Sequence, residues 1–268
     1  MQTPIKITQR LSPNRTIGRD RQIPDIICVH TTGNTFTSGV NTALNPSSGV
    51  SYHYIIAGRD DAARQVRDGD IVQTVDLANM AWANGTNNSD TSLGNRFSTI
   101  QAVREREINA NLYSVSIGLG DMPNGIPSAR QMDALVWLIQ YIHSEVKRLF
   151  DFDIPLARTN VVGHNEIVPR HRPNCPGRNF PWGELMERLN AMPESSVPNV
   201  VLSDATISHN GQPLVLRNLE GKPLDIYFID GTLYAPVSPL ARAFGHDARW
   251  DGASNRLTIT SKNDKILP

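Results

Sequence analysis

Three residues in the first two-thirds of the chain are of types that can bind zinc: His30, His164 and Cys175. A hydrolytic zinc site takes three protein ligands from histidine, cysteine and carboxylates, and it leaves a fourth position open for water. The metal then lowers the pKa of that water and polarises a scissile carbonyl. Each residue also has an ordinary interpretation, because a histidine at a strand end is often only hydrogen-bonded and a lone thiol is often inert. Residue spacing alone leaves both interpretations open.

The only two cysteines are Cys28 and Cys175, which excludes a scaffold of several disulfides. The pair can form one disulfide, remain as two free thiols, or take part in metal binding. Cys28 shares strand parity with His30, so we expect its side chain on the same face, close behind a metal site. A disulfide would remove Cys175 as a ligand, and we favour a buried free thiol at Cys28.

The candidate histidines follow predicted strands. Short apolar runs rich in β-branched residues and bounded by turn residues predict strands at 25–30, 50–57, 71–75, 113–119 and 161–163. His30 ends the first strand and precedes a polar loop, TTGNTFTSG, while His164 directly follows the last strand. Both histidines are therefore expected at strand ends.

One strong amphipathic helix is predicted at 128–150, where apolar residues recur at helical spacing and should face the sheet. Ser128 and Gln131 form a capping-box pattern at its start. A shorter helix is predicted at 181–189, and the polar segment 84–111 is interpreted as a long surface loop.

Composition divides the chain into two domains and a linker. Residues 1–190 hold the strands, the helices and the candidate ligands described above. Residues 191–200 are rich in proline and serine and lack periodicity, which is typical of a linker. Residues 201–268 contain short strand candidates separated by NG and DG turns, with a helical stretch at 238–244. This pattern predicts a small β-rich domain.

The charge balance argues against two classes of partner. The 268 residues include 26 lysines and arginines and 26 aspartates and glutamates, so no basic surplus favours a nucleic acid or an anionic membrane. No apolar run approaches the roughly 20 residues that cross a bilayer. The first residues, MQTPIKITQR, lack the apolar core of a secretory signal, so we do not expect the chain as written to export itself.

Five motifs in a fixed order resemble one protein family. They are IICVHTTGN, SYHYIIA, AWANG, YSVSIGLG and VVGHNEIVPRHRPNCPGRNFPW. Over about residues 20–190 they resemble the type-2 N-acetylmuramoyl-L-alanine amidases, which include phage endolysins, bacterial autolysins and animal peptidoglycan recognition proteins. The resemblance implies an α/β (α+β) fold, with a mixed central sheet flanked by helices and a zinc groove at one edge. It also implies zinc-dependent hydrolysis of the amide bond between N-acetylmuramic acid and L-alanine in bacterial peptidoglycan.

The resemblance assigns a role to each candidate. The ligands of Zn²⁺ fall on His30, His164 and Cys175. The family's tyrosine falls on Tyr52, whose phenol can donate to the developing oxyanion or steer water, although a strand tyrosine can also simply pack. We expect the neighbouring His53 to be structural, because strand alternation turns it to the opposite face.

Two departures from the family pattern concern catalysis. Many members carry a glutamate, the general base, at the end of the strand that resembles YSVSIGLG, but here Gly118 and Gly120 occupy the two plausible positions. Some members work without this glutamate, relying on tyrosine and a cation. The alternative is a non-catalytic peptidoglycan-binding protein that has lost its general base.

The second departure lies in the loop before the last ligand. Pro173 stands where many members have a lysine, with Arg170, His171 and Arg172 just upstream. A cation here would stabilise the oxyanion, and Arg172 is the first choice and His171 the second. Each of these cations can equally be a solvated loop charge.

Three further positions match residues that edge the substrate groove in the family: Trp82, Asn84 and Asn34. They are the candidate substrate-binding residues.

The C-terminal domain has its own resemblance. The segments ISHNGQPL and GTLYAPVSPLARAFGHDARWDGASNRLTIT resemble the copper amine oxidase N-terminal-like module of bacterial envelope proteins. This implies an appendage that binds the wall or targets the substrate. We expect a monomer that acts outside the cell at the wall. It would be either secreted with a signal that this sequence lacks or released as a phage lysin through a membrane lesion.

Overall fold

The structure, a computed structural model, describes residues 7–87 and 94–191 of the N-terminal part of the chain. In the C-terminal part it describes residues 201–202, 207–209, 212–214, 227–229, 232–234, 237–251 and 256–261. The chain divides into two compact units, Met1–Met192 and Pro193–Pro268. The predicted linker at 191–200 lies outside the described residues, except for Ala191, which ends a helix.

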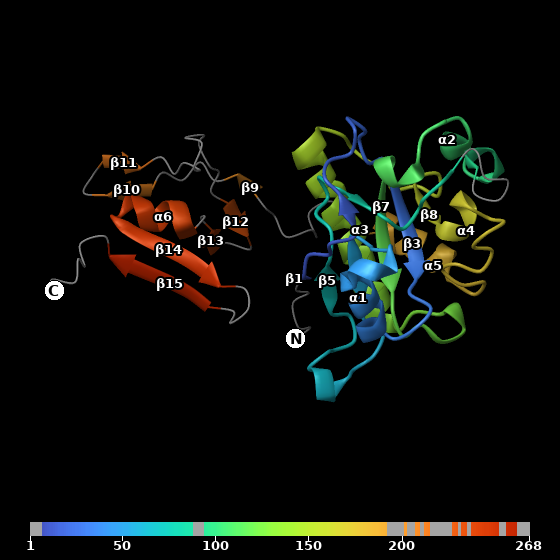
Figure 1. The fold of residues 1–268 in the computed structure, drawn as a ribbon, viewed down its shortest axis with the longest axis horizontal. Helices are drawn as coiled ribbons and strands as arrows, with labels where there is room; N and C mark the ends of the chain where they lie inside the picture. Colours follow the sequence, from blue (N-terminus) through green and yellow to red (C-terminus); the bar gives the residue numbers. More distant parts are fainter. Residues whose placement is uncertain are drawn as a thin grey trace. The chain divides into compact units, whose positions relative to one another are not determined.

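A mixed sheet forms the centre of the N-terminal unit (Figure 1). Its strand order within the described residues is β1-β5-β4-β7-β3-β8, and each neighbouring pair is parallel except β4 with β5. The strands are β1 (Ile7–Gln9), β3 (Ile26–Thr31), β4 (Tyr54–Ile56), β5 (Ile71–Gln73), β7 (Ser114–Leu119) and β8 (Val161–Gly163). A separate antiparallel pair is formed by β2 (Arg15–Thr16) and β6 (Met80–Ala81). The prediction of a mixed central sheet is confirmed.

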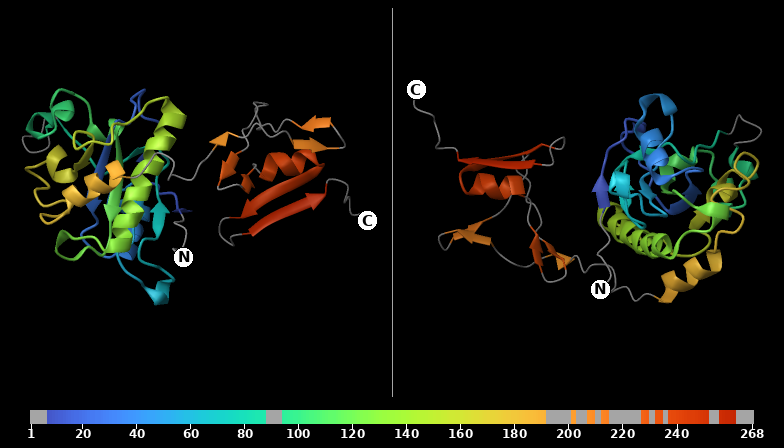
Figure 2. Two further views of the ribbon diagram at one scale, coloured as in Figure 1. Left: turned by 180° about the vertical axis from the view of Figure 1, so that it is seen from behind. Right: turned by 90° about the horizontal axis from the view of Figure 1, so that it is seen from below.

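Helices cover both faces of this sheet. Helices α3 (Ala129–Phe150) and α5 (Trp182–Ala191) pack on one face and lie in front of the strands when the molecule is seen from behind (Figure 2). The opposite face is covered by α1 (Phe36–Leu44), α2 (Gln101–Arg104) and α4 (His164–Ile167). Short 3-10 helices complete the described part of this unit: η1 (Pro46–Ser48), η2 (Ala62–Arg64), η3 (Asn95–Phe97), η4 (Ala110–Tyr113) and η5 (Pro123–Gly125).

The side chains of β3 alternate between the two faces of the sheet. Ile27 and Val29 belong to the core beneath α3, and Ile26 and Cys28 belong to the core on the opposite face, because side chains alternate along a strand. All four are fully buried, as expected for a strand with parallel neighbours on both sides. His30 has the parity of Cys28 and therefore lies on the face away from α3.

Helix α3 begins as predicted, but its capping differs from the expected box. The hydroxyl of Ser128, the N-cap residue, accepts a hydrogen bond from the backbone N–H of Gln131. The Gln131 amide does not return to the cap, because it donates to the carbonyls of Ile56 at 3.0 Å and Gly120 at 2.8 Å. This buried glutamine links the first turn of α3 to the ends of β4 and β7.

Two predicted segments differ from the structure. The strand predicted at 50–57 is a strand only at β4, because the backbone N–H of Ser51 bonds instead to the carbonyl of Trp82 at 3.2 Å. The polar loop predicted after His30 is shorter than expected, because α1 begins at Phe36 with Thr35 as its N-cap. Threonine, serine and glycine are poor helix formers and mask the apolar stripe of this helix in the sequence.

The described residues of the C-terminal unit are rich in β-structure, as predicted. Strand β12 (Tyr227–Ile229) pairs with β13 (Thr232–Tyr234) and β9 (Val201–Leu202). Two hairpins pair β10 (Ile207–His209) with β11 (Gln212–Leu214), and β14 (His246–Asp251) with β15 (Arg256–Ser261). Helix α6 (Val237–Ala243) corresponds to the helical stretch predicted at 238–244. None of the helices in the described part of the chain has the length and apolarity that a bilayer crossing requires.

Candidate metal centre

Two parallel strands bring the candidate ligands to one edge of the sheet. His30 is the penultimate residue of β3, and His164 directly follows β8, the strand paired with β3. Adjacent parallel strands end at the same edge, so the two imidazoles lie together, with ring centroids 4.4 Å apart. Cys175 joins them from the loop after α4, where its carbonyl accepts a 2.8 Å hydrogen bond from the N–H of Asn165.

The three side chains have the geometry that a metal ion needs. Their ligand atoms all lie within 4.8 Å of one another, and Sγ of Cys175 lies 3.9 Å from Nδ1 of His30. A tetrahedral zinc site with bonds of about 2.1 Å to nitrogen and about 2.3 Å to sulfur has an N–S edge of about 3.6 Å. The spacing and the donor set of His30, His164 and Cys175 therefore fit zinc after a small contraction.

Burial keeps both histidines neutral, which is the state that binds a metal. It lowers the pKa of His164 to about 3, and the charge of Arg172 adds to this shift. The pKa of His30 is lowered well below its usual value by burial and by the nearby His164. Burial raises the pKa of the Cys175 thiol to about 11, although the backbone of Thr31 and the charge of Arg172 oppose this shift. Without metal the thiol keeps its proton at neutral pH, so binding a metal would release that proton.

Both cysteines are free thiols, and no disulfide joins Cys28 to Cys175. Cys28 is fully buried in the same apolar cluster as Val162, on the face of the sheet that carries the candidate ligands. Burial raises its pKa well above the usual value. Cys28 is therefore an unreactive thiol in the core behind the site.

Tyr52 lies edge-on against the imidazole of His30, with the ring centroids 5.3 Å apart. Burial raises the pKa of Tyr52 to about 12, so its phenol keeps its proton at neutral pH and can donate a hydrogen bond. The neighbouring His53 is fully buried, and its Nδ1 accepts a 2.9 Å hydrogen bond from the backbone N–H of Ser116. The surroundings of His53 are those of a structural residue.

Three exposed basic residues, Arg170, His171 and Arg172, lie in the loop that carries the cysteine ligand, and they differ in what they affect. The charge of Arg172 lowers the pKa of all three candidate ligands and of Tyr52. His171 lowers the pKa of one ligand histidine. The guanidinium of Arg170 instead packs 3.6 Å from the ring centroid of Phe97. Arg172 is thus the cation with the broadest electrostatic effect on the cluster.

The three candidate substrate-binding residues have different surroundings. Asn34 is exposed and lines a groove beside the cluster. Trp82 is half-buried, and its indole N–H donates to Oγ1 of Thr16 at 3.0 Å. Asn84 is fully buried, so its predicted contact with substrate has no exposed surface in this structure to support it.

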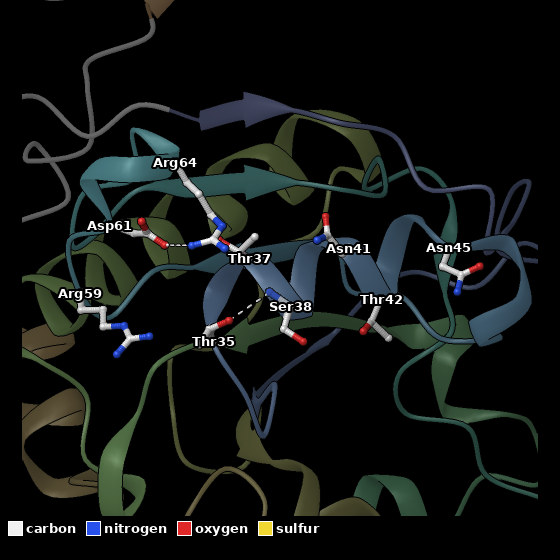
Figure 3. A pocket seen from close by; sticks show the side chains of 9 residues that line it. All are labelled: Thr35, Thr37, Ser38, Asn41, Thr42, Asn45, Arg59, Asp61 and Arg64. Atoms are coloured by element: carbon white, nitrogen blue, oxygen red, sulfur yellow. Dashed lines mark hydrogen bonds and ion pairs between the residues drawn. The ribbon is translucent and has the colours of Figure 1, made fainter.

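An open groove of about 840 Å³ adjoins the cluster. Its lining includes the residue after the first ligand and both neighbours of the third: Thr31, Asn174 and Pro176. It shares Thr35 and Arg59 with a second groove of about 590 Å³, which runs along polar threonine, serine and asparagine side chains of α1 (Figure 3). The two grooves therefore meet at Thr35 and Arg59.

Glu166 and Arg158 fix the turn that carries His164, and the sequence analysis does not predict a role for either residue. The carboxylate of Glu166 accepts hydrogen bonds from the backbone N–H of Gly163 at 2.7 Å and from Arg158 at 2.6 Å. The guanidinium of Arg158 also packs 3.8 Å from the ring centroid of Trp182. A glutamate three residues after an N-cap is a recognisable signal, but nothing in the sequence connects it to this arginine.

The fold and the cluster define an α/β domain with a His₂Cys site, suited to zinc, at the edge of a mixed sheet. A family profile described as N-acetylmuramoyl-L-alanine amidase matches residues 19–178, which is more than half of the chain and includes all three candidate ligands. The chain therefore belongs to the N-acetylmuramoyl-L-alanine amidase family, and this is its enzyme class. A comparison with curated protein sequences finds no match.

Several solved structures are similar to the chain. A selenomethionine derivative of AmpD is 22% identical with a TM-score of 0.44, over 68% of this chain and 92% of that one. A mutant endolysin from Bacillus subtilis is 20% identical with a TM-score of 0.43, over 69% and 99%. The N-acetylmuramoyl-L-alanine amidase LysC from Clostridium intestinale URNW is 18% identical with a TM-score of 0.41, over 71% and 100%.

Proposed function

We propose that this protein is a zinc-dependent hydrolase that cleaves the amide bond between N-acetylmuramic acid and L-alanine in bacterial peptidoglycan. The observation that carries the proposal is the cluster of His30, His164 and Cys175, within the segment that the amidase family matches. When bound by these residues, zinc would supply a Lewis acid for the scissile carbonyl and lower the pKa of a coordinated water. Cell-wall lysis or remodelling would follow from this cleavage.

Tyr52 and Arg172 would stabilise the negative charge that develops on the carbonyl oxygen. The phenol of Tyr52 is protonated at neutral pH and lies against a candidate ligand, so it can donate a hydrogen bond there. The guanidinium of Arg172 is our choice for the cation because its charge reaches both Tyr52 and the ligands, with His171 as the second choice. Neither residue needs to lose a proton for this role.

A carboxylate base is missing from the cluster in the part of the chain that the structure describes. Gly118 and Gly120 have no side chain to offer, and the carboxylate of Glu166 is held by Gly163 and Arg158. This observation favours a second candidate function, a peptidoglycan-binding protein without turnover. Such a protein would retain sugar and peptide contacts in the grooves and release no product.

The grooves beside the cluster suit a polymer of sugars and short peptides, because hydroxyl and amide side chains dominate the lining along α1. Asn34 is a candidate substrate contact in the groove next to the ligands. Trp82 is a second candidate, although it does not line that groove. We further propose that the C-terminal unit is a copper amine oxidase N-terminal-like module that binds the wall. On this proposal the protein acts as a monomer outside the cell, on peptidoglycan and not on nucleic acid or membrane.

Metal titration tests this function. The full chain is stripped with a chelator, reloaded with zinc and incubated with purified cell walls, and released stem peptides are quantified by mass spectrometry. We expect release to rise with zinc up to one equivalent and to vanish in Cys175→Ser, which removes the thiolate. Cell walls that bind the zinc-loaded protein but release no peptide would overturn the hydrolase and support the binding protein.

A further inference from the structure

Asn84 is a buried asparagine held rigidly next to the central strand β7. Its side-chain Nδ2 donates to the hydroxyls of Ser114 at 2.8 Å and Ser116 at 2.9 Å. The hydroxyl of Ser114 in turn donates to the carbonyl of Ala110 at 2.7 Å, so it must accept from the asparagine. Because the NH₂ group faces the serines, the carbonyl oxygen of Asn84 must point the other way.

That oxygen has no hydrogen-bond partner, and neither has one nitrogen of a candidate ligand. Oδ1 of Asn84 and Nε2 of His30 are both buried atoms without a partner. Burial lowers the pKa of His30, and an interaction with the side chain of Asn84 partly opposes this shift, which agrees with a position of Asn84 close to the imidazole. Leaving two buried polar atoms unpaired would cost about 1–3 kcal/mol each.

The pairing of the strands accounts for this proximity. Cys28 pairs with Ser116 and His30 pairs with Gly118 in the parallel register of β3 and β7, so these side chains share one face. Asn84 is bonded to Ser116, which pairs with Cys28, the residue two positions before His30 and on the same face. The other ring nitrogen of His30, Nδ1, faces Sγ of Cys175 at 3.9 Å.

We propose that Asn84 is a positioning residue, whose Oδ1 accepts a hydrogen bond from Nε2–H of His30 and so presents an unprotonated Nδ1 to the metal. The inference rests on the proposed metal centre but concerns the tautomer and orientation of one ligand. A histidine ligand is usually fixed in this way by an acceptor on its second nitrogen. This role requires a buried side chain, which is how Asn84 lies in the structure.

Nitrogen NMR of the full metal-free chain, labelled with ¹⁵N at histidine, tests this pairing without any substitution. At about pH 7.5 we expect His30 to carry its proton on Nε2 and to leave Nδ1 free, because buried histidines here are neutral. A proton on Nδ1 of His30 would overturn the proposal. This measurement holds even if variants of Asn84 fail to fold.

Zinc affinity, measured by competition with a chelating dye, provides the second test. We expect Asn84→Ala to weaken zinc binding about 10- to 100-fold, because Nε2–H of His30 loses its acceptor. Asn14→Ala is the matched control, since it removes another buried amide, bonded to the carbonyls of Ala43 and Val50, and should leave zinc affinity unchanged.

A folded Asn84→Ala variant that binds zinc as tightly as the parent would contradict the proposal. Failure of the parent protein to cleave peptidoglycan would leave both the NMR and the affinity results intact. The two failures are therefore distinguishable.

Discussion

Gly118 lies beside His30 in the pairing of β3 with β7, and the ring of Tyr52 packs over it. A Cβ atom built at this glycine would lie 3.3 Å from Cδ1 and Cδ2 of Tyr52, which is tighter than ordinary van der Waals contact. At Gly120 a Cβ would lie 2.4 Å from Cα of Phe36, so a side chain there would displace backbone. Gly120 is therefore required by the backbone of its neighbour, whereas a side chain at 118 would have to shift Tyr52.

Restoring a carboxylate at 118 should not restore a base. We expect Gly118→Glu to lower kcat/KM at least about tenfold, because its side chain would displace the phenol of Tyr52. Peptide release from cell walls measures this, with Gly183→Ala as a control, since a Cβ there meets nothing within 4 Å. An increase in kcat/KM for Gly118→Glu would show that the site accommodates the missing base.

Arg172 offers a second test at the residue scale. We expect Arg172→Ala to lower kcat about 100-fold, equivalent to about 3 kcal/mol, because it removes positive charge from the developing oxyanion. Arg170→Ala is a matched control in the same loop, since Arg170 packs on Phe97, and it should leave kcat within about twofold. Equal losses in the two variants would assign the effect to the loop and not to the charge.

At the scale of elements, Gln131 joins α3 to the strands that end near the site. Its amide donates to the carbonyls of Ile56 and Gly120. In Gln131→Leu the Ile56 carbonyl keeps the backbone N–H of Gly120 at 3.0 Å, but the Gly120 carbonyl loses this donor. We expect the free energy of unfolding to fall by about 1–3 kcal/mol in urea denaturation. The neighbouring Arg130→Ala, at an exposed position, should change it by less than about 0.5 kcal/mol. A Gln131→Leu loss as small as that of the control would contradict this role.

The elements differ in how far the sequence predicts them. Strands β3 and β8 and helix α3 follow from apolar periodicity, and they place His30 and His164 at one edge. Helix α1 does not, because its buried face is interrupted by residues with low helix propensity. The position of Cys175 and the role of Asn84 depend on contacts between distant segments, which local patterns do not encode.

At the scale of the whole N-terminal unit, a buried neutral histidine makes stability depend on pH. Burial, and next the charge of Arg19, lower the pKa of His53 well below its unfolded value of about 6.5. Below that pH the unfolded chain binds a proton that the folded chain does not, so the contribution is complete above about pH 6.5 and is lost as the pH falls.

We expect this histidine to make the metal-free protein up to about 2 kcal/mol less stable at about pH 5 than at about pH 7.5. Urea unfolding at the two pH values measures the difference, and His53→Gln should reduce it. An equal dependence in the variant and the parent would show that His53 does not contribute.

We propose that a cluster of two histidines and one cysteine serves to cut the bond between the glycan and its stem peptide. The most direct measurement is the chemical identity of the products that the zinc-loaded full chain releases from purified peptidoglycan, determined by mass spectrometry and amino-terminal analysis. We predict stem peptides with new L-alanine amino termini and intact glycan strands, and none from Cys175→Ser. Uncut peptidoglycan, or products cut within the glycan or within the peptide, would contradict the account.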